Sequence, residues 1–449
     1  MKTIFITCFH GFIGRNILSA DVLTALKARD IRVVILAPKA RAPSLRDEFG
    51  GEGVIVEGID VSKEIEDRTE RFFWAMATNL LATGTRRVQR RVKLAEDGNW
   101  ADYIFSLFFS FLGRFRWVRS LYRGAAALAV SGQEFAPFFE KYRPGLVFAT
   151  DVYALQDVKM MRSAKRRSIP VVGMVRSWDN VTSKTLLQHI PDCIAVNSSR
   201  IRKELECYGG VPKDKVFVVG VPHYDRYLAG GHHSRSSFCK AFGLDEKKKI
   251  ILFATPSDRY LKGNPITPIA LEALKGMKDV QVFVRLPVVG KAELDNYRPP
   301  PNVVFDDPGS YPDFTVAHVS READQHLADC LAVCDVVITW ASTMIVDAAV
   351  FGKPVILVGF DATPRPYHQS ILRFYDYEHH RPVLKYKAAR LVKSPKELLE
   401  WTERYLSNPR LDEQGRRRIV EEFCGPTDGK AGERLGNFIL ERLKYENQG

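Results

Sequence analysis

The sequence lacks the features that would direct a chain out of the cell or through a membrane. Its seven cysteines are scattered and form no Cys-x-x-Cys pair, so we expect reduced thiols and neither a zinc motif nor a redox motif. Residues Met1 to Phe12 lack the basic start, long apolar run and cleavage site of a signal peptide. The longest uncharged apolar stretch of the basic region, Tyr103 to Gly113, is far shorter than the ~20 residues that span a bilayer. We therefore expect a cytoplasmic protein without a transmembrane helix.

Two motifs that would indicate a resident cofactor or metal are also missing. The turn from His10 to Gly14 has Gly-x-x-Gly rather than three glycines, and no acidic residue follows Ala37-Pro38 at the end of the next predicted strand. A nicotinamide cofactor is therefore not indicated. Nowhere are two aspartates separated by one residue, so the Asp-x-Asp metal motif is absent. We expect no cofactor and no required metal ion.

Acidic residues are in deficit, and the deficit is uneven. The 449 residues include 66 Lys and Arg against 53 Asp and Glu, which gives a net charge of +13. Between Arg71 and Val130 there are ten basic and three acidic residues, a local excess of +7. A basic chain favours an anionic partner such as phosphate, nucleic acid or a membrane surface. No recognised nucleic-acid-binding module accompanies the basic region, so we do not expect nucleic acid as the partner.

The order of predicted elements indicates an α/β fold with two Rossmann-like domains. We expect an N-terminal domain over 1–228, a C-terminal domain over 247–428 and a closing helix over 429–449. Residues from about 66 to 130 have helical spacing rich in arginine and aromatics and predict a helical insertion. The Gly-Gly, His and Ser residues between Tyr227 and Lys249 predict a linker. Apolar runs predict parallel strands at Thr3–Thr7, Arg32–Leu36, Leu146–Thr150, Val171–Val175, Cys193–Asn197, Val216–Val219, Lys249–Ala254, Val280–Arg285, Val303–Phe305, Val336–Thr339 and Pro354–Val358.

The segment from Asp335 to Ile356 carries the clearest signal for a ligand. A buried strand ends in a turn with Ser342 and Thr343, and a helix begins there. The first amides of a helix and its dipole favour an anion such as phosphate, and the two hydroxyls would add donors. A simple helix cap by Ser342 would use the same residues. The turn lies at the carboxyl end of a predicted parallel strand, and this position favours a ligand site over a simple cap.

This segment resembles the donor-site strand, turn and helix of GT-B glycosyltransferases and of the related CDP-glycerol glycerophosphotransferases. The segment from Thr427 to Leu435 is similar to the Asp-Gly-Lys-Ala stretch that opens the last helix of the polyol-phosphate transferases. Residues Gly220 to Asp225 resemble their Gly-x-Pro-x-x-Asp turn. The resemblance covers roughly Val171 to Leu435 and implies two Rossmann-like domains that face a cleft, with a nucleotide-activated donor on the C-terminal one.

On the donor side the resemblance places Ser342, Thr343 and Asp347 at the phosphates. Thr255 to Arg259 and Arg285 each follow a predicted strand and should lie at the same edge. Fixed cations can stabilise a diphosphate leaving group without a metal. We expect the donor and phosphate site to comprise Arg285, Ser342, Thr343, Asp347, Ser257 and Arg259, with a surface ion pair as the alternative role of each arginine.

The acceptor side is expected where the N-terminal strands end. Residues Trp178-Asp179-Asn180 stand where the polyol-phosphate transferases have Trp-His-Gly, whose histidine is the proposed base. Our hypothesis is that Asp179 deprotonates the acceptor hydroxyl, although it would also suit a helix cap. His10 is the second candidate base, or a phosphate contact. The other expected acceptor-side residues are Gly11, Arg15, Arg176, Trp178 and Asn180.

These features predict a metal-independent glycosyltransferase that moves a sugar from a nucleotide donor to a glycan or lipid-linked acceptor, in surface polysaccharide or glycolipid assembly. The alternatives are a CDP-glycerol-type polyol-phosphate transferase, a nucleotide-sugar 2-epimerase and an inactive assembly factor. The basic stretches Arg86 to Arg91 and Arg114 to Arg123 lie beside aromatics. They predict either a helix face on an anionic membrane or a solvated charged face. We expect peripheral attachment at the inner face of the cell membrane.

Overall fold

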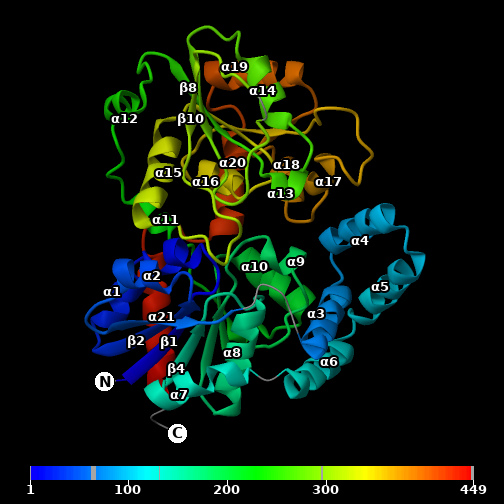
Figure 1. Cartoon of the computed structure of the whole chain (residues 1–449), viewed down its shortest axis with the longest axis vertical. Helices are drawn as coiled ribbons and strands as arrows, with labels where there is room; N and C mark the ends of the chain where they lie inside the picture. Colours follow the sequence, from blue (N-terminus) through cyan, green and yellow to red (C-terminus); the bar gives the residue numbers. More distant parts are fainter. Residues whose placement is uncertain (1, 62–66, 131, 295–296, 446–449) are drawn as a thin grey trace. The chain divides into compact units, whose positions relative to one another are not determined.

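The computed structural model describes residues 2–61, 67–130, 132–294 and 297–445 (Figure 1). The chain forms two units. The first comprises Met1–Leu228, Phe314–Ser320 and Glu422–Gly449, and the second comprises Ala229–Asp313 and Arg321–Glu421. The short segment Phe314–Ser320 therefore packs with the first unit although the chain on either side of it belongs to the second.

A seven-stranded parallel sheet forms the centre of the first unit. Its order is β3-β2-β1-β4-β5-β6-β7, so the direction of winding reverses between β1 and β4. Ile4 pairs with Val33 on one side and with Leu146 on the other. The strands are β1 (Lys2–Thr7), β2 (Ile31–Pro38), β3 (Val54–Ile59), β4 (Leu146–Ala149), β5 (Val171–Met174), β6 (Cys193–Val196) and β7 (Val216–Val218).

The central strands are apolar throughout because helices cover the sheet. Ile4, Phe5 and Ile6 are all completely buried although successive side chains point to opposite faces. The helices outside the insertion are α1 (Val22–Lys27), α2 (Ala42–Phe49), α7 (Ala136–Tyr142), α8 (Leu155–Arg166), α9 (Asn180–Ser183), α10 (Ser199–Glu204), α11 (Tyr224–Leu228) and α21 (Ala431–Tyr445).

The closing helix α21 completes the first unit. Its apolar side chains, including Leu435 and Ile439, join the core formed by β1, β2 and α1. A Cβ on Gly436 would lie 2.6 Å from the Cβ of Ala25, so the glycine permits the close approach of α1 and α21. Asp225 accepts hydrogen bonds from the first amides of α21, at Ala431 (3.0 Å) and Gly432 (2.6 Å). The two family-like motifs at Gly220–Asp225 and Thr427–Leu435 thus meet as a helix cap.

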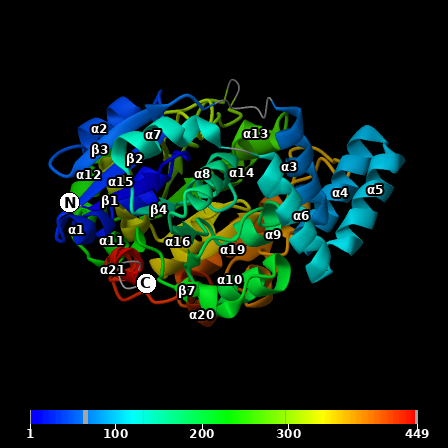
Figure 2. The same cartoon turned by 90° about the horizontal axis from the view of Figure 1, so that it is seen from below.

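Four helices form the insertion: α3 (Arg68–Leu80), α4 (Gly84–Asp97), α5 (Trp100–Leu112) and α6 (Arg116–Ala129). They gather on one side of the first unit, with α5 outermost (Figure 2). Glu66, where the insertion was expected to begin, lies outside the described residues.

The prediction of a basic face on the insertion is wrong in part, because three of its arginines point inward. Arg90 donates to the carbonyl of Leu81, and Arg119 donates to those of Cys207 and Tyr208. Arg123 donates to the carbonyl of Leu187. Hydrogen bonds to these carbonyls offset the cost of burying the guanidinium groups, so these arginines fasten helices instead of facing solvent.

The second unit contains a six-stranded parallel sheet of order β10-β9-β8-β11-β12-β13, with its reversal between β8 and β11. Its strands are β8 (Lys249–Ala254), β9 (Val280–Arg285), β10 (Val303–Asp306), β11 (Val336–Thr339), β12 (Val355–Val358) and β13 (Arg390–Val392). Its helices are α12 (Arg235–Phe242), α13 (Asp258–Leu261), α14 (Ile266–Leu274), α15 (Arg321–Val333), α16 (Met344–Val350), α17 (Leu372–Tyr375), α18 (Arg381–Lys385) and α19 (Pro395–Ser407), and α20 (Glu413–Cys424) runs across the division between the units.

Three local expectations differ from the structure. The segment predicted as a linker contains α12, whose Phe238 and Cys239 are buried. The helical pattern after Gly14 is split into a π-helical turn, Gly14–Leu18, and α1. The edge strands β3 and β13 were not predicted because Glu57 and Gly58 interrupt the first and the second has only three residues.

Candidate functional site

Each sheet has one point where loops from adjacent strands leave in opposite directions. Ligands of doubly wound folds bind outside the carboxyl ends of the strands at this point. In the first unit it lies between β1, which His10 follows, and β4, which Asp151 follows. In the second unit it lies between β8, which Ser257 follows, and β11, which Ser342 follows. Most of the predicted site residues therefore lie near one of these two edges.

The loop after β1 is covered by the segment Phe314–Ser320. The amide of Gly11 donates to the carbonyl of Phe314 at 2.7 Å, and the ring of Phe314 stacks on His10 with 5.0 Å between centroids. A Cβ on Gly11 would lie 2.6 Å from the carbonyl oxygen of Ala317. Only glycine lets the segment approach this closely, which explains Gly11 without a direct role in binding.

The protonation state of His10 follows from its contacts. Its Nδ1 accepts a hydrogen bond from the amide of Phe12 at 3.2 Å. Burial lowers the pKa of His10 well below its usual value, and the charges of Arg176, Lys184 and two further arginines lower it more. The ring is therefore neutral near pH 7 and carries its proton on Nε2. In this form His10 can donate a hydrogen bond from Nε2, but it cannot act as a base there.

Four cations lie within electrostatic range of His10. They are Arg176 after β5, Lys184 after α9, Arg41 at the start of α2 and Arg15 in the π-helical turn Gly14–Leu18. Arg176 pairs with Asp151 at 2.9 Å. Arg15 donates to Asn16 and stands over the ring of Phe12, 5.0 Å from its centroid. The carboxyl edge of the first sheet thus carries an excess of positive charge around a neutral imidazole.

Arg41 is the most deeply buried of these cations, with 1% of its surface exposed. Its guanidinium donates to the carbonyls of Cys8 and Ala317. Its Nε has no hydrogen-bond partner among the described residues. A charge held this deep on carbonyl oxygens adds to the local positive potential.

Asp179 and Asn180 lie together at the start of α9. The carboxylate of Asp179 accepts a hydrogen bond from the hydroxyl of Ser177 and makes no side-chain cap of the helix. The hydroxyl of Ser183 donates to the backbone carbonyl of Asp179 at 2.8 Å and lies 3.4 Å from its carboxylate. The side chain of Asn180 is 1% exposed, and neither its Oδ1 nor its Nδ2 has a partner among the described residues. A buried amide without partners is costly, so this position is suited to a ligand or an ordered water. The ring of Trp178 packs on Phe423, 4.8 Å between centroids.

A second carboxylate, Asp157, lies beneath this edge. It is buried, and its Oδ1 accepts hydrogen bonds from the hydroxyl of Thr7 and the amide of Asp151. Burial, followed by the charge of Asp151, raises the pKa of Asp157 to about 8. It therefore contributes little negative charge near pH 7.

Replacing Asp157 by asparagine is expected to flatten the pH dependence of stability. The unfolded carboxyl titrates near its usual pKa of about 4, so between about pH 4 and pH 8 the folded chain binds more protons. The free energy of unfolding therefore falls as pH rises through this window, by at most about 1.4 kcal/mol per pH unit. Asparagine keeps the accepting oxygen and does not titrate. Urea unfolding at pH 5, 6.5 and 8 measures the slope.

The matched control is Asp192→Asn, because Asp192 is more exposed and pairs with Lys165. The control is expected to keep the wild-type slope. If Asp157→Asn unfolds with the same pH dependence as the wild-type protein, the raised pKa is wrong.

The edge of the second sheet brings the predicted hydroxyls together. The Oγ of Ser342 lies 3.1 Å from the Oγ1 of Thr339, and the amide of Ser342 donates to the carbonyl of Trp340. Thr343 precedes α16, makes no side-chain cap and is exposed. Asp347 is buried on the same helix. These hydroxyls and the uncapped start of α16 can offer donors to an anion.

Ser257 and Arg259 follow β8 and are already engaged by their own unit. The Oγ of Ser257 donates to the carbonyl of Val289 at 2.9 Å and accepts from the amide of Arg259. The guanidinium of Arg259 donates to the carbonyl of Pro312 at 2.8 Å. Ser257 therefore holds the loop that follows β9, whereas Arg259 is exposed.

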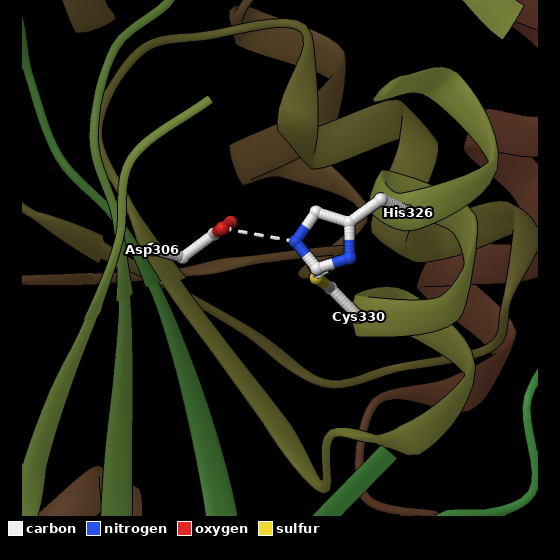
Figure 3. Close-up of side chains that lie close together, drawn as sticks. All are labelled: Asp306, His326 and Cys330. Carbon is white, nitrogen blue, oxygen red and sulfur yellow. Dashed lines mark hydrogen bonds and ion pairs between the residues drawn. The ribbon is translucent and has the colours of Figure 1, made fainter. Parts of the chain in front are cut away.

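Arg285 is buried in an ion pair with Asp306. Asp306 also bonds His326 (Figure 3). The Nε2 of His326 lies 2.9 Å from the Oδ1 of Asp306. Burial raises the pKa of Asp306, but the hydrogen bond from His326 and the charge of Arg285 outweigh burial and lower it overall. Arg285 would reach a phosphate only by leaving Asp306.

Asp306, His326 and Cys330 are also the described residues whose ligand atoms could hold a metal ion, since these atoms all lie within 4.8 Å of one another. The sulfur of Cys330 lies 3.8 Å from Nε2 of His326 and 4.0 Å from Nδ1. It is thus beside the ring and not along the Nε2 lone pair, where a metal would bind. In this geometry the cluster ties β10 to α15, and it would need a new Cys330 rotamer to coordinate an ion.

Several site residues were missed because sequence spacing does not reveal them. Arg41, Asp157 and Lys184 reach the edge from the start of α2, from α8 and from the turn after α9. Phe314 lies in the short segment Phe314–Ser320, which is far from the rest of the first unit in sequence. For Arg41 the only available signal was its position shortly after a predicted strand. Nothing in the sequence around Phe314 indicated its contact with His10.

Two doubly wound parallel sheets with flanking helices define the chain as an α/β protein of the GT-B class. A family model described as CDP-Glycerol:Poly(glycerophosphate) glycerophosphotransferase matches residues 183–441, and the chain belongs to this family. Family and fold together make it a transferase. The resemblance and the fold class predicted from the sequence are therefore confirmed.

Solved structures of similar fold extend over the whole chain. A glycosyltransferase from Rickettsia africae has a TM-score of 0.52 and 11% identity, covering 100% of this chain and 99% of its own. A UDP-GlcNAc 2-epimerase from Methanocaldococcus jannaschii has a TM-score of 0.55 and 13% identity, covering 98% and 100%. One from Neisseria meningitidis, bound to UDP-GlcNAc, has a TM-score of 0.54 and 12% identity, with the same coverage. At these identities the likeness shows the fold alone.

A search of curated proteins gave no significant match. Within the described ranges, no helix is long and apolar enough to cross a membrane.

Proposed function

We propose that the chain transfers a polyol phosphate, such as glycerol phosphate, from a cytidine-diphosphate-activated donor to a hydroxyl of a phosphate-bearing acceptor. The family match supports the donor class. The observation that carries the acceptor class is the set of four cations around the neutral ring of His10.

Charge favours an anionic acceptor at the first unit. Of the carboxylates near these cations, Asp151 is paired with Arg176, Asp157 is held mostly protonated at pH 7, and the proposed base Asp179 offsets one further positive charge. The remaining positive charge suits the phosphate of an acceptor chain or lipid-linked primer, and His10 would donate to it from Nε2. The unpartnered amide of Asn180 can bond the acceptor hydroxyl or its neighbours.

In the proposed reaction the acceptor oxygen attacks the phosphorus that bears the glycerol. A new O–P bond forms, the O–P bond to cytidine monophosphate breaks, and the hydroxyl proton passes to the carboxylate of Asp179. The hydrogen bond from Ser177 orients that carboxylate. On the second unit, Ser342 and Thr343 would donate to the donor phosphates, and Asp347 and Arg259 are the nearby charged groups predicted from the sequence.

The product nucleotide tests the proposal. Purified protein incubated with CDP-glycerol and a glycerol-phosphate primer is expected to release cytidine monophosphate, measured by chromatography. Lys184→Gln is expected to raise the KM for the primer several-fold, because one of the cations facing His10 is lost, with little change in kcat. A matched control is Lys213→Gln, which removes an exposed lysine near β7.

A second candidate is sugar transfer, as the sequence analysis expected. The turn Trp178-Asp179-Asn180 lacks the histidine of the polyol-phosphate transferases, which favours this alternative. Nucleotide sugars would then yield a nucleoside diphosphate in the presence of a glycan or lipid-linked acceptor. Conversion of a nucleotide sugar without acceptor would indicate an epimerase. A chain that binds no nucleotide would be an inactive assembly factor, and both proposals would fail.

We also propose that the insertion attaches the protein to an anionic membrane surface, where surface polysaccharide or glycolipid acceptors are assembled. On α5 the residues Trp100, Ile104, Leu107, Phe108 and Phe111 repeat at helical spacing and remain 42% to 64% exposed. The inward side of α5 carries the buried Ser106, which donates to Asn79, and Phe109, which packs on the core of the insertion. Helix α5, which lies outermost in the insertion (Figure 2), therefore exposes a row of large apolar side chains to solvent.

A further inference from the structure

Three aromatic rings meet at the carboxyl edge of the second sheet. Tyr260 lies in α13 after β8, Trp340 follows β11 directly, and Phe374 lies in α17 after β12. These strands are neighbours in the sheet, at and next to the point where its winding reverses. Sequence analysis singled out none of the three.

The rings form a single cluster that remains open to solvent. The centroids of Tyr260 and Trp340 are 5.1 Å apart at 47°, and Phe374 stands edge-on to both, at 6.4 Å and 5.6 Å. Tyr260 keeps 42% of its surface exposed, and Trp340 and Phe374 are only part-buried. Large aromatic side chains usually lie in a core, so an exposed cluster at a ligand-binding edge indicates a surface for a flat partner.

Arg373 holds the cluster in place. Its guanidinium donates to the carbonyl of Tyr260 at 3.3 Å and to that of His368 at 2.7 Å. The same group lies over the ring of Phe374, 4.6 Å from the centroid. Helices α13 and α17 are thereby joined, so the rings are ordered before any ligand binds, and little entropy is lost on binding.

We propose that Trp340, with Tyr260 beside it, is the stacking platform for the nucleobase of the donor. This assignment rests on the proposed function, in which the donor is a nucleotide. Trp340 stands two residues before Ser342, whose hydroxyl is proposed to meet the donor phosphates. One ribose separates base from phosphate in a nucleotide, so adjacent positions of the chain can serve both. Stacking accepts any base face, so the platform provides affinity and leaves the choice of base to other contacts.

Measuring the binding of CDP and of pyrophosphate distinguishes the contribution of the base to affinity from that of the phosphates. Calorimetry is expected to show that Trp340→Leu weakens CDP binding by about tenfold or more, because base–aromatic stacking is lost. Pyrophosphate, which has no base, should bind the variant and the wild-type protein equally. Trp340→Phe should restore most of the CDP affinity. The matched control is Trp401→Leu, a tryptophan of α19 that packs with Arg390 and Arg404.

Fluorescence gives an independent readout that does not depend on affinity. CDP is expected to quench tryptophan emission of the wild-type protein and of Trp401→Phe, but not of Trp340→Phe, which binds CDP without the reporter. The inference is overturned if Trp340→Leu binds CDP as tightly as the wild-type protein. It is also overturned if the affinity of this variant for pyrophosphate falls by the same factor as its affinity for CDP. A wild-type protein that binds pyrophosphate but no nucleotide also overturns it. If the wild-type protein binds neither, the proposed function fails first.

Discussion

Asp179→Asn is expected to lower kcat by about 10²- to 10⁴-fold while leaving the affinity for CDP unchanged, because general-base catalysis typically supplies this factor. The physical reason is that the amide of asparagine cannot take the proton of the acceptor hydroxyl, whereas its Oδ1 can still accept the hydrogen bond from Ser177. His10 cannot replace it as a base, because its Nδ1 is occupied by the amide of Phe12 and its Nε2 bears the proton. The measurement is turnover of CDP-glycerol with saturating primer.

The matched control is Asp214→Asn, an exposed aspartate of the same unit outside the site. It is expected to turn over at the wild-type rate. The pH dependence of turnover gives a second test. In a plot of log kcat against pH, the acidic limb, where activity rises with pH as the base loses its proton, should disappear in Asp179→Asn. Full turnover by Asp179→Asn would remove this residue from the mechanism. Loss of CDP binding together with turnover would point to a structural defect.

Replacing Trp100, Phe108 and Phe111 by serine is expected to reduce binding to anionic vesicles at least about a hundredfold, since each large apolar side chain contributes about 1.5–3 kcal/mol when fully buried. All three lie on the outward face of α5. Flotation with phosphatidylglycerol vesicles and with neutral phosphatidylcholine vesicles measures the effect. Wild-type protein should prefer the anionic vesicles, because Arg114 and Arg116 are exposed beside this face.

The control for flotation is Tyr367→Ser, which removes a 45% exposed aromatic from the second unit. It should float like the wild-type protein, and the triple variant should keep full turnover of a soluble primer. Equal recovery of wild-type protein with neutral and anionic vesicles would count against electrostatic attraction. Unchanged flotation of the triple variant would exclude α5 as the contact.

The interior of both sheets was predictable because central parallel strands are apolar on both faces. Lys249–Ala254, Val280–Arg285 and Val336–Thr339 have the predicted bounds. Two of the edge strands, β3 and β13, were not predicted, because an edge strand packs against fewer neighbours and tolerates charge, whereas the edge strands β7 and β10 were predicted. β3, for example, includes Glu57, which pairs with Lys141.

The candidate site was predictable only where chemistry is local in sequence. Asp179, Asn180 and Arg176 share one loop, and their density of polar groups was visible directly. The electrostatics of His10 depends instead on Arg41, some thirty residues away in the chain, and on a ring stacked from residue 314. The same limit explains why the inward orientation of Arg119 and Arg123 was not predicted. Helical periodicity alone does not reveal that their guanidinium groups donate to carbonyls distant in the sequence.

The discontinuity of the first unit has a consequence for synthesis. Its sheet is encoded by residues up to 228, yet the helix that covers α1 and is capped by Asp225 is encoded at the very end of the chain. At about 5–20 residues per second, the remaining ~220 residues take roughly 10–40 s to emerge from the ribosome. During that interval the apolar side chains of β1, β2 and α1 that pack against α21 lack this cover, so the core of the first unit is completed only after α21 has emerged.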